Sequence, residues 1–450
     1  MAETRNGNSF VTASDGWRPS RYNCCRTVTG SPTRATRYRL LPTGGNAART
    51  WRLRDVAVTV PLQELVSFLV VQPRGNAPRF PGGLPSSPSS PSSIMHAAAT
   101  RRGIVRALIS LFTGAIVACG GSAENKTVAL TGAGATFPYP IYSKWFDAFY
   151  KATGNQVNYQ SLGSGAGIKQ FTQGTVEFGA TDGPMSDAEI AAVKGQVLHL
   201  PTVLGADAVT WNLPSLGDTQ LKFDAATIAD IFLGKITKWN DPRLAALNPG
   251  VTLPAIDLLV VHRSDGSGTT FIWTDYLSTI SPEWLSKVGR GKSVNWPVGL
   301  GGKGNEGVTQ QIKQVEGTIG YVELIYALAN KLPVGLLKNK SGAFVAPTLE
   351  SVSAAAAGVS LGEDTDFRIS IVDASGVDAY PVASFTWLLI NPDLADVAKA
   401  TAIKQFLTWM NTPEAAAMAK ELHYAPLPAS VAERVKARIA TLKGAGRVLP

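Results

Sequence analysis

The chain has 450 residues, of which 45% are hydrophobic and 8% aromatic, enough for two or three globular domains and too apolar for a disordered protein. Its formal net charge of +9 comes entirely from the N-terminal quarter. Residues 1–118 carry 15 Arg, no Lys and 4 acidic residues, a net +11, whereas the rest carries 27 basic and 29 acidic residues, a net −2. The main body therefore lacks the basic excess that binds nucleic acid, and no nucleic-acid partner is expected.

Residues 1–94 have a composition unlike that of a folded domain. All 12 of their basic residues are Arg, and residues 85–93 repeat Pro-Ser-Ser three times, which cannot bury a core. Cys24 and Cys25 are adjacent, and no nearby His or Cys could complete a metal site with them. We predict a disordered or spurious N-terminal extension, with a genuine unfamiliar module as the alternative.

Residues 95–118 have the pattern of a secretory signal peptide. Three Arg precede the mostly apolar run 107–118, which is too short for a stable transmembrane span. The run ends in Ile-Val-Ala-Cys, which resembles the lipobox of bacterial lipoproteins and predicts lipidation of Cys119. Translation is then expected to start at or near Met95, and simple cleavage near Ala118 is the alternative to lipidation.

The rest of the chain alternates strand-like and helix-like patterns. The predicted strands are residues 127–131, 156–160, 176–181, 197–213 with a break at Gly205, and 383–390. The predicted helices are residues 138–153, a short one that follows 163–167 and extends through residue 171, 187–194, 392–410, 413–422 and 430–442. Residues 225–233, 257–263, 269–278 and 308–315 continue the alternation. This order predicts an α/β fold in which strand ends lead into helix N-termini.

Three segments share one local pattern, in which a strand is followed by small Gly, Ser or Thr residues and then a helix. They are residues 132–137, 163–167 and 263–270. Helix N-termini bind oxyanions through free N–H groups and the positive end of the helix dipole. Ser and Thr add hydroxyl donors, and the guanidinium of Arg263 can hold two oxygens of one anion. Together the segments favour an anion-binding site.

Nucleotide loops and hydrolase nucleophiles fit these segments poorly. No segment has the Lys-Ser/Thr ending of a P-loop, and Phe137 replaces the last glycine of a dinucleotide fingerprint. Ser164 and Ser267 lack the glycine two positions earlier that a nucleophile elbow requires. The chain has no cysteine after Cys119, and its three later histidines lie far apart, so a structural role is favoured for each of them.

Several motifs together resemble the periplasmic phosphate-binding protein of Pst-type phosphate ABC transporters, the PstS family. The matching motifs, in order, are LTGAGATFP at 130–138, VNYQ at 157–160, FGATD at 178–182, LGKI at 233–236, DGSGT at 265–269, WPVGLGGKGN at 296–305 and IGYVE at 319–323. The resemblance begins near residue 127, extends to the C-terminal region and preserves the order of the motifs.

The resemblance implies a two-lobed α/β fold, the type II periplasmic-binding-protein fold, with the ligand cleft between the lobes. The first lobe would be discontinuous, formed by residues 119–203 and 381–450, and the second would comprise residues 204–380. The implied protein is a monomeric receptor in the periplasm or another extracytoplasmic space. If Cys119 is lipidated, this residue would anchor the receptor to the membrane. Its partners would be inorganic phosphate and the membrane permease and ATPase subunits of the transporter, without cofactor, metal or catalytic residue.

The resemblance also assigns the residues that would bind phosphate. They are Thr136, the Phe137 backbone, Ser164, Asp182, Arg263, Ser267, Gly268 and Thr269. Asp265 would orient Arg263 and partly neutralise it.

Asp182 is an unexpected residue in an anion site, because a carboxylate repels anions. Ionised Asp182 repels an anion unless the anion brings a proton to share; near neutral pH phosphate carries one and sulfate does not. Asp182 is therefore expected to favour phosphate over sulfate, and the alternative is that it only caps the turn at 183–186. The functions left open are a receptor for another tetrahedral oxyanion such as sulfate, a phosphate-ester hydrolase that uses the same loops, and an envelope phosphate sensor.

Overall fold

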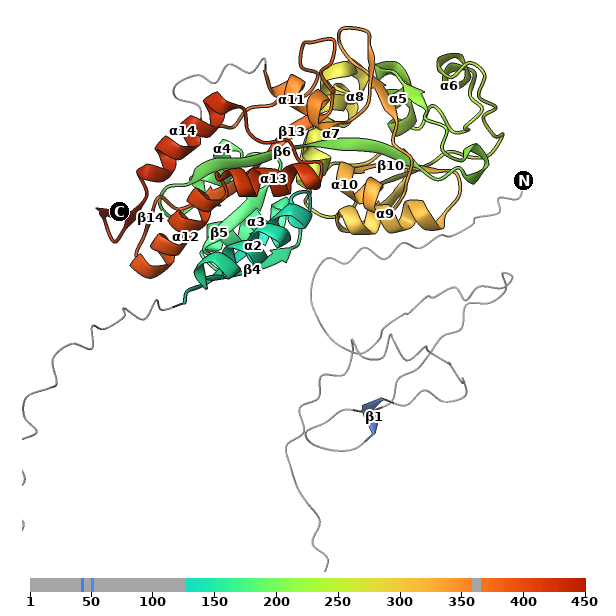
Figure 1. Cartoon of the computed structure of the whole chain (residues 1–450). Helices are drawn as coiled ribbons and strands as arrows, with labels where there is room; N and C mark the ends of the chain where they lie inside the picture. The colour runs from blue at the N-terminus through green and yellow to red at the C-terminus, as the bar shows by residue number, and fades with distance from the viewer. Residues whose placement is uncertain (1–41, 44–49, 52–126, 358–365) are drawn as a thin grey trace, which may run out of the picture. The chain divides into compact units, whose positions relative to one another are not determined.

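A computed structural model describes residues 42–43, 50–51, 127–357 and 366–450 (Figure 1). The chain divides into two units, Met1–Gly114 and Ala115–Pro450. In the first unit, the described residues form one antiparallel pairing of β1 (Pro42–Thr43) with β2 (Thr50–Trp51). Apart from these four residues, the predictions for the extension 1–94 lie outside the described residues. The same holds for the signal peptide 95–118 and Cys119.

The second unit is built on an eight-stranded mixed sheet in the order β4-β3-β5-β13-β6-β10-β8-β9. The strands are β3 (Ala129–Gly134), β4 (Gln156–Ser161), β5 (Phe178–Thr181), β6 (Leu198–Trp211), β8 (Leu259–Arg263), β9 (Leu300–Gly302), β10 (Thr318–Glu323) and β13 (Ala383–Ile390). The strands β3, β4 and β5 are parallel, as are β8, β9 and β10. The central β6 pairs antiparallel with β13 and with β10, and so connects the two parallel groups.

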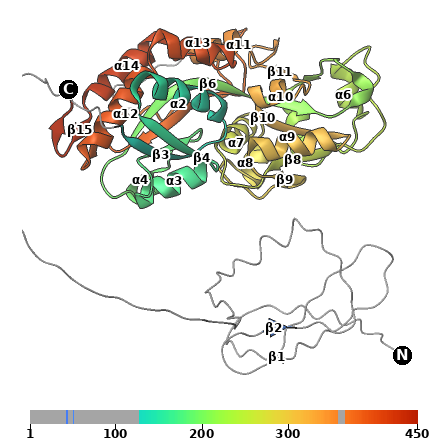
Figure 2. The ribbon, with the colours of Figure 1, turned by 60° about the horizontal axis from the view of Figure 1, so that its bottom comes forward.

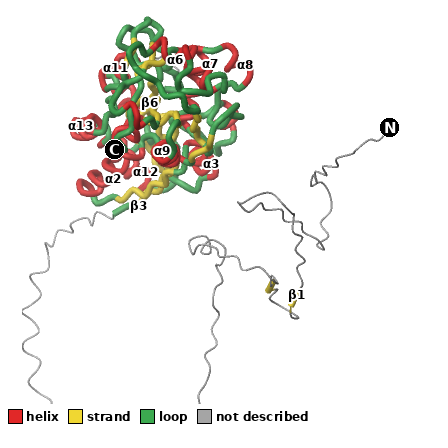
Figure 3. The backbone as a smooth tube through the Cα atoms, turned by 90° about the vertical axis from the view of Figure 1, so that its right-hand side faces the viewer, coloured by secondary structure: helices red, strands yellow, loops and turns green. Residues whose placement is uncertain are grey.

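Helices cover both faces of this sheet, as the views in Figures 2 and 3 show. They are α2 (Tyr139–Thr153), α3 (Ser164–Gln173), α4 (Asp187–Ala191), α5 (Ala225–Phe232), α6 (Pro242–Leu247), α7 (Gly268–Ile280), α8 (Pro282–Lys287), α9 (Gly304–Gln314), α10 (Leu324–Ala329), α11 (Leu349–Ala357), α12 (Val397–Trp409), α13 (Pro413–Glu421) and α14 (Ala429–Ala440). Among the described residues, no helix is both long and apolar enough to cross a membrane.

Apolar faces explain how the helices pack. Helix α2 buries an aromatic stripe that includes Trp145, Phe146 and Phe149, as its helical spacing predicts. On the other face of the sheet, Ile168 and Phe171 of α3 pack in a separate small cluster. In the other parallel group, α9 and α10 form a third cluster against β8 and β10. Burial on both faces is why the central strands carry almost no exposed residue.

Two small sheets complete the unit. One joins β7 (Lys222–Phe223), β11 (Leu336–Lys338) and β12 (Phe344–Val345), and the other joins β14 (Asp393–Leu394), β15 (Lys443–Gly444) and β16 (Arg447–Val448). The two-lobed α/β architecture is confirmed, with β3–β5 in one half and β8–β10 in the other (Figure 2). The residues proposed for the lobe boundaries stay a prediction.

Several predicted element bounds were wrong: α3 begins at residue 164 within the predicted loop 163–167, α4 ends at residue 191, and α9 begins at residue 304 instead of 308. Two further differences have a clear physical reason. Strand β6 runs without interruption through Gly205, which pairs with Ser384 of β13. The ring of Phe137 lies against Gly205, and a β-carbon there would come within 2.6 Å of it. The glycine thus marks a close approach, not a break. The helix predicted over 392–410 begins at residue 397, because residues 393–394 pair with β15 and the Asp396 side chain caps the helix by accepting from the Lys399 N–H.

Candidate functional site

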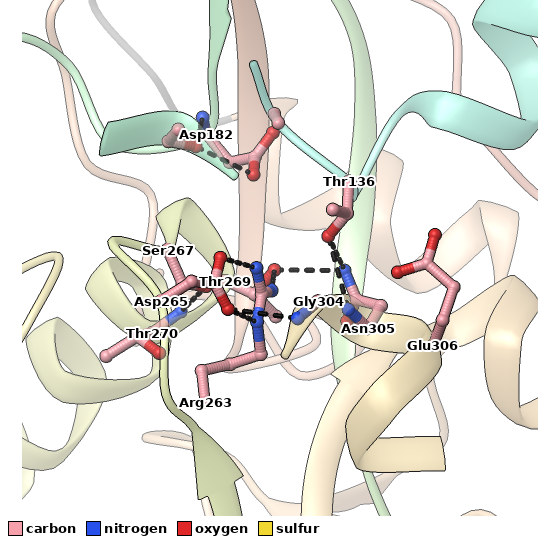
Figure 4. A network of polar contacts seen from close by, with 12 residues as sticks. Thr136, Asp182, Arg263, Asp265, Ser267, Thr269, Thr270, Gly304, Asn305 and Glu306 are labelled. Atoms are coloured by element: carbon pink, nitrogen blue, oxygen red, sulfur yellow. Dashed lines mark hydrogen bonds and ion pairs between the residues drawn. The ribbon is translucent and has the colours of Figure 1, made fainter. Parts of the chain in front are cut away.

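Four strand-to-helix turns meet at the centre of the second unit. The N-termini of α3, α7 and α9 and the loop before α2 lie together, although they are far apart in the sequence (Figure 4). Three contacts connect the two halves here. The Gly165 N–H donates to the Gly266 carbonyl at 2.8 Å, the Asn305 amide donates to Thr136 Oγ1 at 2.8 Å, and the Tyr326 hydroxyl donates to the Thr136 carbonyl at 2.6 Å. The two halves are therefore in contact around the site.

Arg263 ends strand β8 and supplies the positive charge of the site. Its Nε and Nη2 donate to the two carboxylate oxygens of Asp265 at 2.8 and 2.5 Å, and its Nη1 donates to Thr269 at 3.0 Å (Figure 4). Among residues 127–357 and 366–450, Arg263 is the only buried Lys or Arg side chain. Burial alone would raise the pKa of Asp265, but the hydrogen bonds and charge of Arg263 outweigh it and hold this pKa below its usual range. Asp265 therefore holds two nitrogens of the guanidinium, and its role in orienting Arg263 for a ligand stays a prediction.

Asp182 follows strand β5 and is completely buried opposite the arginine. It accepts hydrogen bonds from Thr386 at 2.8 Å and from Ser164 at 3.3 Å. Burial raises the pKa of Asp182 to about 7, against the lowering effect of the Thr386 hydrogen bond and the Arg263 charge. The site thus contains two carboxyl groups whose pKa values are shifted in opposite directions, upward for Asp182 and downward for Asp265.

Helix α7 brings its first residues close to Asp182. Ser267 caps the helix by accepting from the Thr270 N–H at 3.0 Å, and its own N–H donates to the Lys292 carbonyl at 2.8 Å. The N–H groups of Gly268 and Thr269, at the start of the helix, therefore face the site. A β-carbon on Gly268 would lie 2.5 Å from both Asp182 Oδ2 and Ser164 Oγ. Only glycine permits this approach of the helix N-terminus to the opposite half.

The residues assigned from the sequence are all brought together. Thr136, Ser164, Asp182, Arg263, Ser267, Gly268, Thr269 and the supporting Asp265 lie within one connected polar cluster or directly against it. Phe137 lies beside it, with its ring against Gly205 and its carbonyl accepting from the Tyr424 hydroxyl at 2.6 Å. What these residues bind stays a prediction at this point.

Asn305 is a central residue that the sequence-based assignment missed. Its side-chain amide donates to Thr136 and to Thr269 at 2.8 and 3.2 Å, and its side-chain oxygen accepts from the Glu323 N–H at 3.0 Å. It therefore fixes hydroxyls from two different helix starts. The signal was present, because Asn305 ends the motif 296–305, but a lone amide after a Gly-rich turn does not reveal its partners.

Two histidines of the described region have structural contacts, as favoured from the sequence. His199 is buried, accepts from the Met185 N–H at 3.2 Å and is 2.6 Å from Asp366. His262 stacks on Trp296 with ring centroids 4.7 Å apart. Over the described ranges, no group of three His, Cys, Asp or Glu side chains is placed to hold a metal ion.

The chain matches known proteins over the part that holds this site. A family model described as a PBP superfamily domain matches residues 120–414. The phosphate-binding protein PstS of Pasteurella multocida is 46% identical over 314 residues, which cover 70% of this chain and 90% of that protein. PstS of Methanocaldococcus jannaschii is 42% identical, covering 64% of this chain and 80% of its own length.

Solved structures show the same fold. A phosphate-binding protein from Stenotrophomonas maltophilia superposes with a TM-score of 0.56 at 20% identity, covering 69% of this chain and 94% of that one. With its fold, its ordered motifs and these relatives, the chain belongs to the PBP superfamily and, within it, to the PstS family of phosphate-binding proteins.

Proposed function

We propose that this protein is a receptor for inorganic phosphate that delivers its ligand to a phosphate-import ABC transporter and carries out no chemistry itself. The observation that carries this proposal is the pairing of two unlike charges across one buried cluster. Arg263, held by Asp265, and the free N–H groups of α3 and α7 attract an oxyanion, while Asp182 faces the same cluster as an acceptor. The relatives named for phosphate binding support the choice of anion.

The proposed binding residues are Thr136, the Phe137 backbone, Ser164, Asp182, Arg263, Ser267, Gly268 and Thr269. Hydroxyls and backbone N–H groups would donate to the phosphate oxygens, and Arg263 would hold two of them. Asp182 would accept the proton that phosphate carries and sulfate lacks, so it would select one tetrahedral anion over the other. Selectivity would then depend on a hydrogen bond that only a protonated anion can donate.

The proposed setting is the cell envelope. Export through the leader 95–118 would place the receptor outside the cytoplasm, and lipidation of Cys119 would anchor it to the membrane. Its transport partners would be the permease and ATPase subunits, to which it would bind as a monomer with its two lobes closed on phosphate.

The test is calorimetric titration of the protein, stripped of bound phosphate, with phosphate and then with sulfate. We expect saturable 1:1 binding of phosphate and little or no response to sulfate. Equal binding of sulfate would overturn the selectivity and favour a general oxyanion receptor. Hydrolysis of a generic phosphate ester by the same preparation would favour the hydrolase, and failure to bind the transporter's membrane subunits would favour an envelope sensor.

A further inference from the structure

Two buried acids lie behind the site and belong to none of the assigned roles. Asp207 on β6 and Glu323 on β10 are direct register partners on adjacent antiparallel strands, and neither is exposed to solvent. Directly opposed side chains on one face of such a pair have β-carbons about 4.5–5.5 Å apart. The sheet therefore places two carboxyl groups side by side in the centre of the protein.

These acids lack the partners that a buried carboxylate needs. Both carboxyl oxygens of Asp207 and Oε1 of Glu323 have no hydrogen-bond partner among the described residues. Glu323 Oε2 accepts from the Ile325 N–H at 3.0 Å and from the Tyr424 hydroxyl at 3.1 Å. An ionised carboxylate that is buried without such partners is strongly unfavourable, whereas a protonated one is tolerated.

The ionisable groups that face the pair offer no free positive charge. Asp182 and Arg263 interact with Asp207 across the site, and Tyr321 and Tyr380 lie near it from β10 and from the segment before β13. Tyr326, Tyr424 and Asp182 interact with Glu323. Arg263 is already paired with Asp265, so the cluster contains one guanidinium for four carboxyl groups.

A bound anion makes this imbalance worse. Burial is the main cause that raises the pKa of both Asp207 and Glu323 well above the ordinary values, and each is raised further by the charge of Asp182. The negative charge of phosphate acts in the same direction. Ionised Asp207 would repel the ligand without touching it.

We propose that Asp207 and Glu323 form a buried acid pair that must hold its protons while phosphate is bound, so that Asp207 sets the upper pH limit of binding. This inference rests on the proposed function. The two acids act through the field they create at the site and contact no ligand.

Linkage gives the sign of the effect. If binding requires a proton on Asp207, the phosphate Kd rises with pH above the pKa of the ligand-free form, by up to about tenfold per pH unit. The rise continues until the pKa of the bound form is reached. Replacing Asp207 by a side chain that cannot ionise removes its contribution to the pH dependence of the phosphate Kd. The contributions of the other ionisable groups and of phosphate itself remain.

The experiment measures phosphate Kd from pH 6 to pH 9.5 for the wild type, Asp207→Asn, Asp207→Val and Glu323→Gln. The control is Glu306→Gln, which removes an exposed carboxyl at the rim of the site. Phosphate's own ionisation is common to all five proteins and cancels in the ratio of their Kd values. Melting curves establish that each variant is folded.

We expect all five proteins to bind similarly at pH 6. As the pH rises toward 9.5, the Asp207 variants should bind increasingly more tightly than the wild type, by up to about tenfold per pH unit, because they lose one linked proton. Glu323→Gln should also bind phosphate more tightly than the wild type at high pH. The phosphate Kd of Glu306→Gln should follow that of the wild type over the whole pH range. If the curves of phosphate Kd against pH are parallel for the wild type and the folded Asp207 or Glu323 variants, the inference is overturned. If the wild type fails to bind phosphate at pH 6, the proposed function is overturned instead.

Discussion

At the scale of single residues, the site places two aspartates in opposite electrostatic environments. Asp265 accepts from the Nε and Nη2 of the Arg263 guanidinium and stays ionised, whereas Asp182 accepts only from hydroxyl donors and is buried as completely as the core residues. In the proposed site, the first would partly neutralise the arginine, so that it recognises an anion without attracting every anion strongly. The second would impose a requirement for a proton on whatever binds.

Asp182→Asn should lower the preference for phosphate over sulfate about tenfold or more, because the amide can donate to either anion and no longer repels the unprotonated one. The preference is measured as the ratio of the two dissociation constants by calorimetry. Asp275→Asn is the matched control, because Asp275 is also buried but is paired with Arg290 and Ser370 away from the site. An unchanged ratio in Asp182→Asn would reject the selective role.

The same ratio should depend on pH. Because the pKa of Asp182 is raised to about 7, the group is largely protonated at pH 6 and can then donate to sulfate, whereas at pH 8 it is largely ionised and repels it. The ratio of sulfate Kd to phosphate Kd should therefore rise from pH 6 to pH 8. In Asp182→Asn the pH dependence of the ratio reflects only phosphate's own ionisation. The wild-type ratio divided by the Asp182→Asn ratio should therefore rise from pH 6 to pH 8, and a quotient that falls over this range would contradict the assignment.

At the residue scale, contiguous motifs were enough to predict which side chains the structure brings together, although what these side chains bind stays a prediction. Thr136, Ser164, Arg263 and Ser267 each sit in a short Gly-rich turn before a helix, and the turn itself points to the chemistry. Asn305 and Asp207 could not be found in this way. The role of Asn305 depends on hydroxyls 169 and 36 positions away, and that of Asp207 depends on the register of two strands.

At the scale of elements, the site consists of helix starts held at fixed distances by the sheet. Helix α7 can approach the opposite half this closely because Gly268, its first residue, has no side chain. The long amphipathic helices and buried strands were predictable because their hydrophobic period is clear. The two-residue strands and β9 could not be predicted from the sequence. Segments of two or three residues have no hydrophobic period to detect, and they form only when their partner strands are in place.

Gly268→Ala tests this element-scale constraint. The added methyl group would overlap Asp182 and Ser164, so the two halves could not close fully and phosphate affinity should fall at least about tenfold. Gly217→Ala is the control, since its position at φ 52° has nothing within 4 Å and adds only local backbone strain. Calorimetry gives the affinities and thermal melts the stabilities. Wild-type affinity in Gly268→Ala would show that the close approach is not needed for binding.

At the scale of the whole molecule, some contacts between the two halves lie outside the anion site. Lys292, in the segment after α8, donates to the Pro184 carbonyl at 2.8 Å and to Glu189 at 2.9 Å, and its ammonium lies 5.6 Å from the centre of the Phe271 ring. Pro184 and Glu189 belong to the half that contains Asp182, on the other side of the proposed cleft. Lys292 is therefore placed to hold the protein closed without touching the ligand.

Lys292→Met keeps the length of the side chain and removes both charge-assisted hydrogen bonds. Because the contact exists only when the halves are together, its loss should act on opening, and the rate of phosphate release should rise about three- to tenfold. Release can be followed by stopped-flow tryptophan fluorescence, since eight tryptophans follow Cys119 in the sequence. The ratio of phosphate to sulfate affinity should not change, because only the backbone carbonyl of Lys292 contacts the anion site, by accepting from the Ser267 N–H at 2.8 Å, and the substitution leaves that carbonyl in place.

Lys287→Met is the matched control, because Lys287 forms its ion pair with Glu283 within the single helix α8 and bridges nothing. Its release rate should equal that of the wild type. If Lys292→Met also releases phosphate at the wild-type rate, the Lys292 contacts form too late or too weakly to oppose opening. The closed state would then be held by the anion site itself, through the contacts of Thr136 with Asn305 and of Gly165 with Gly266.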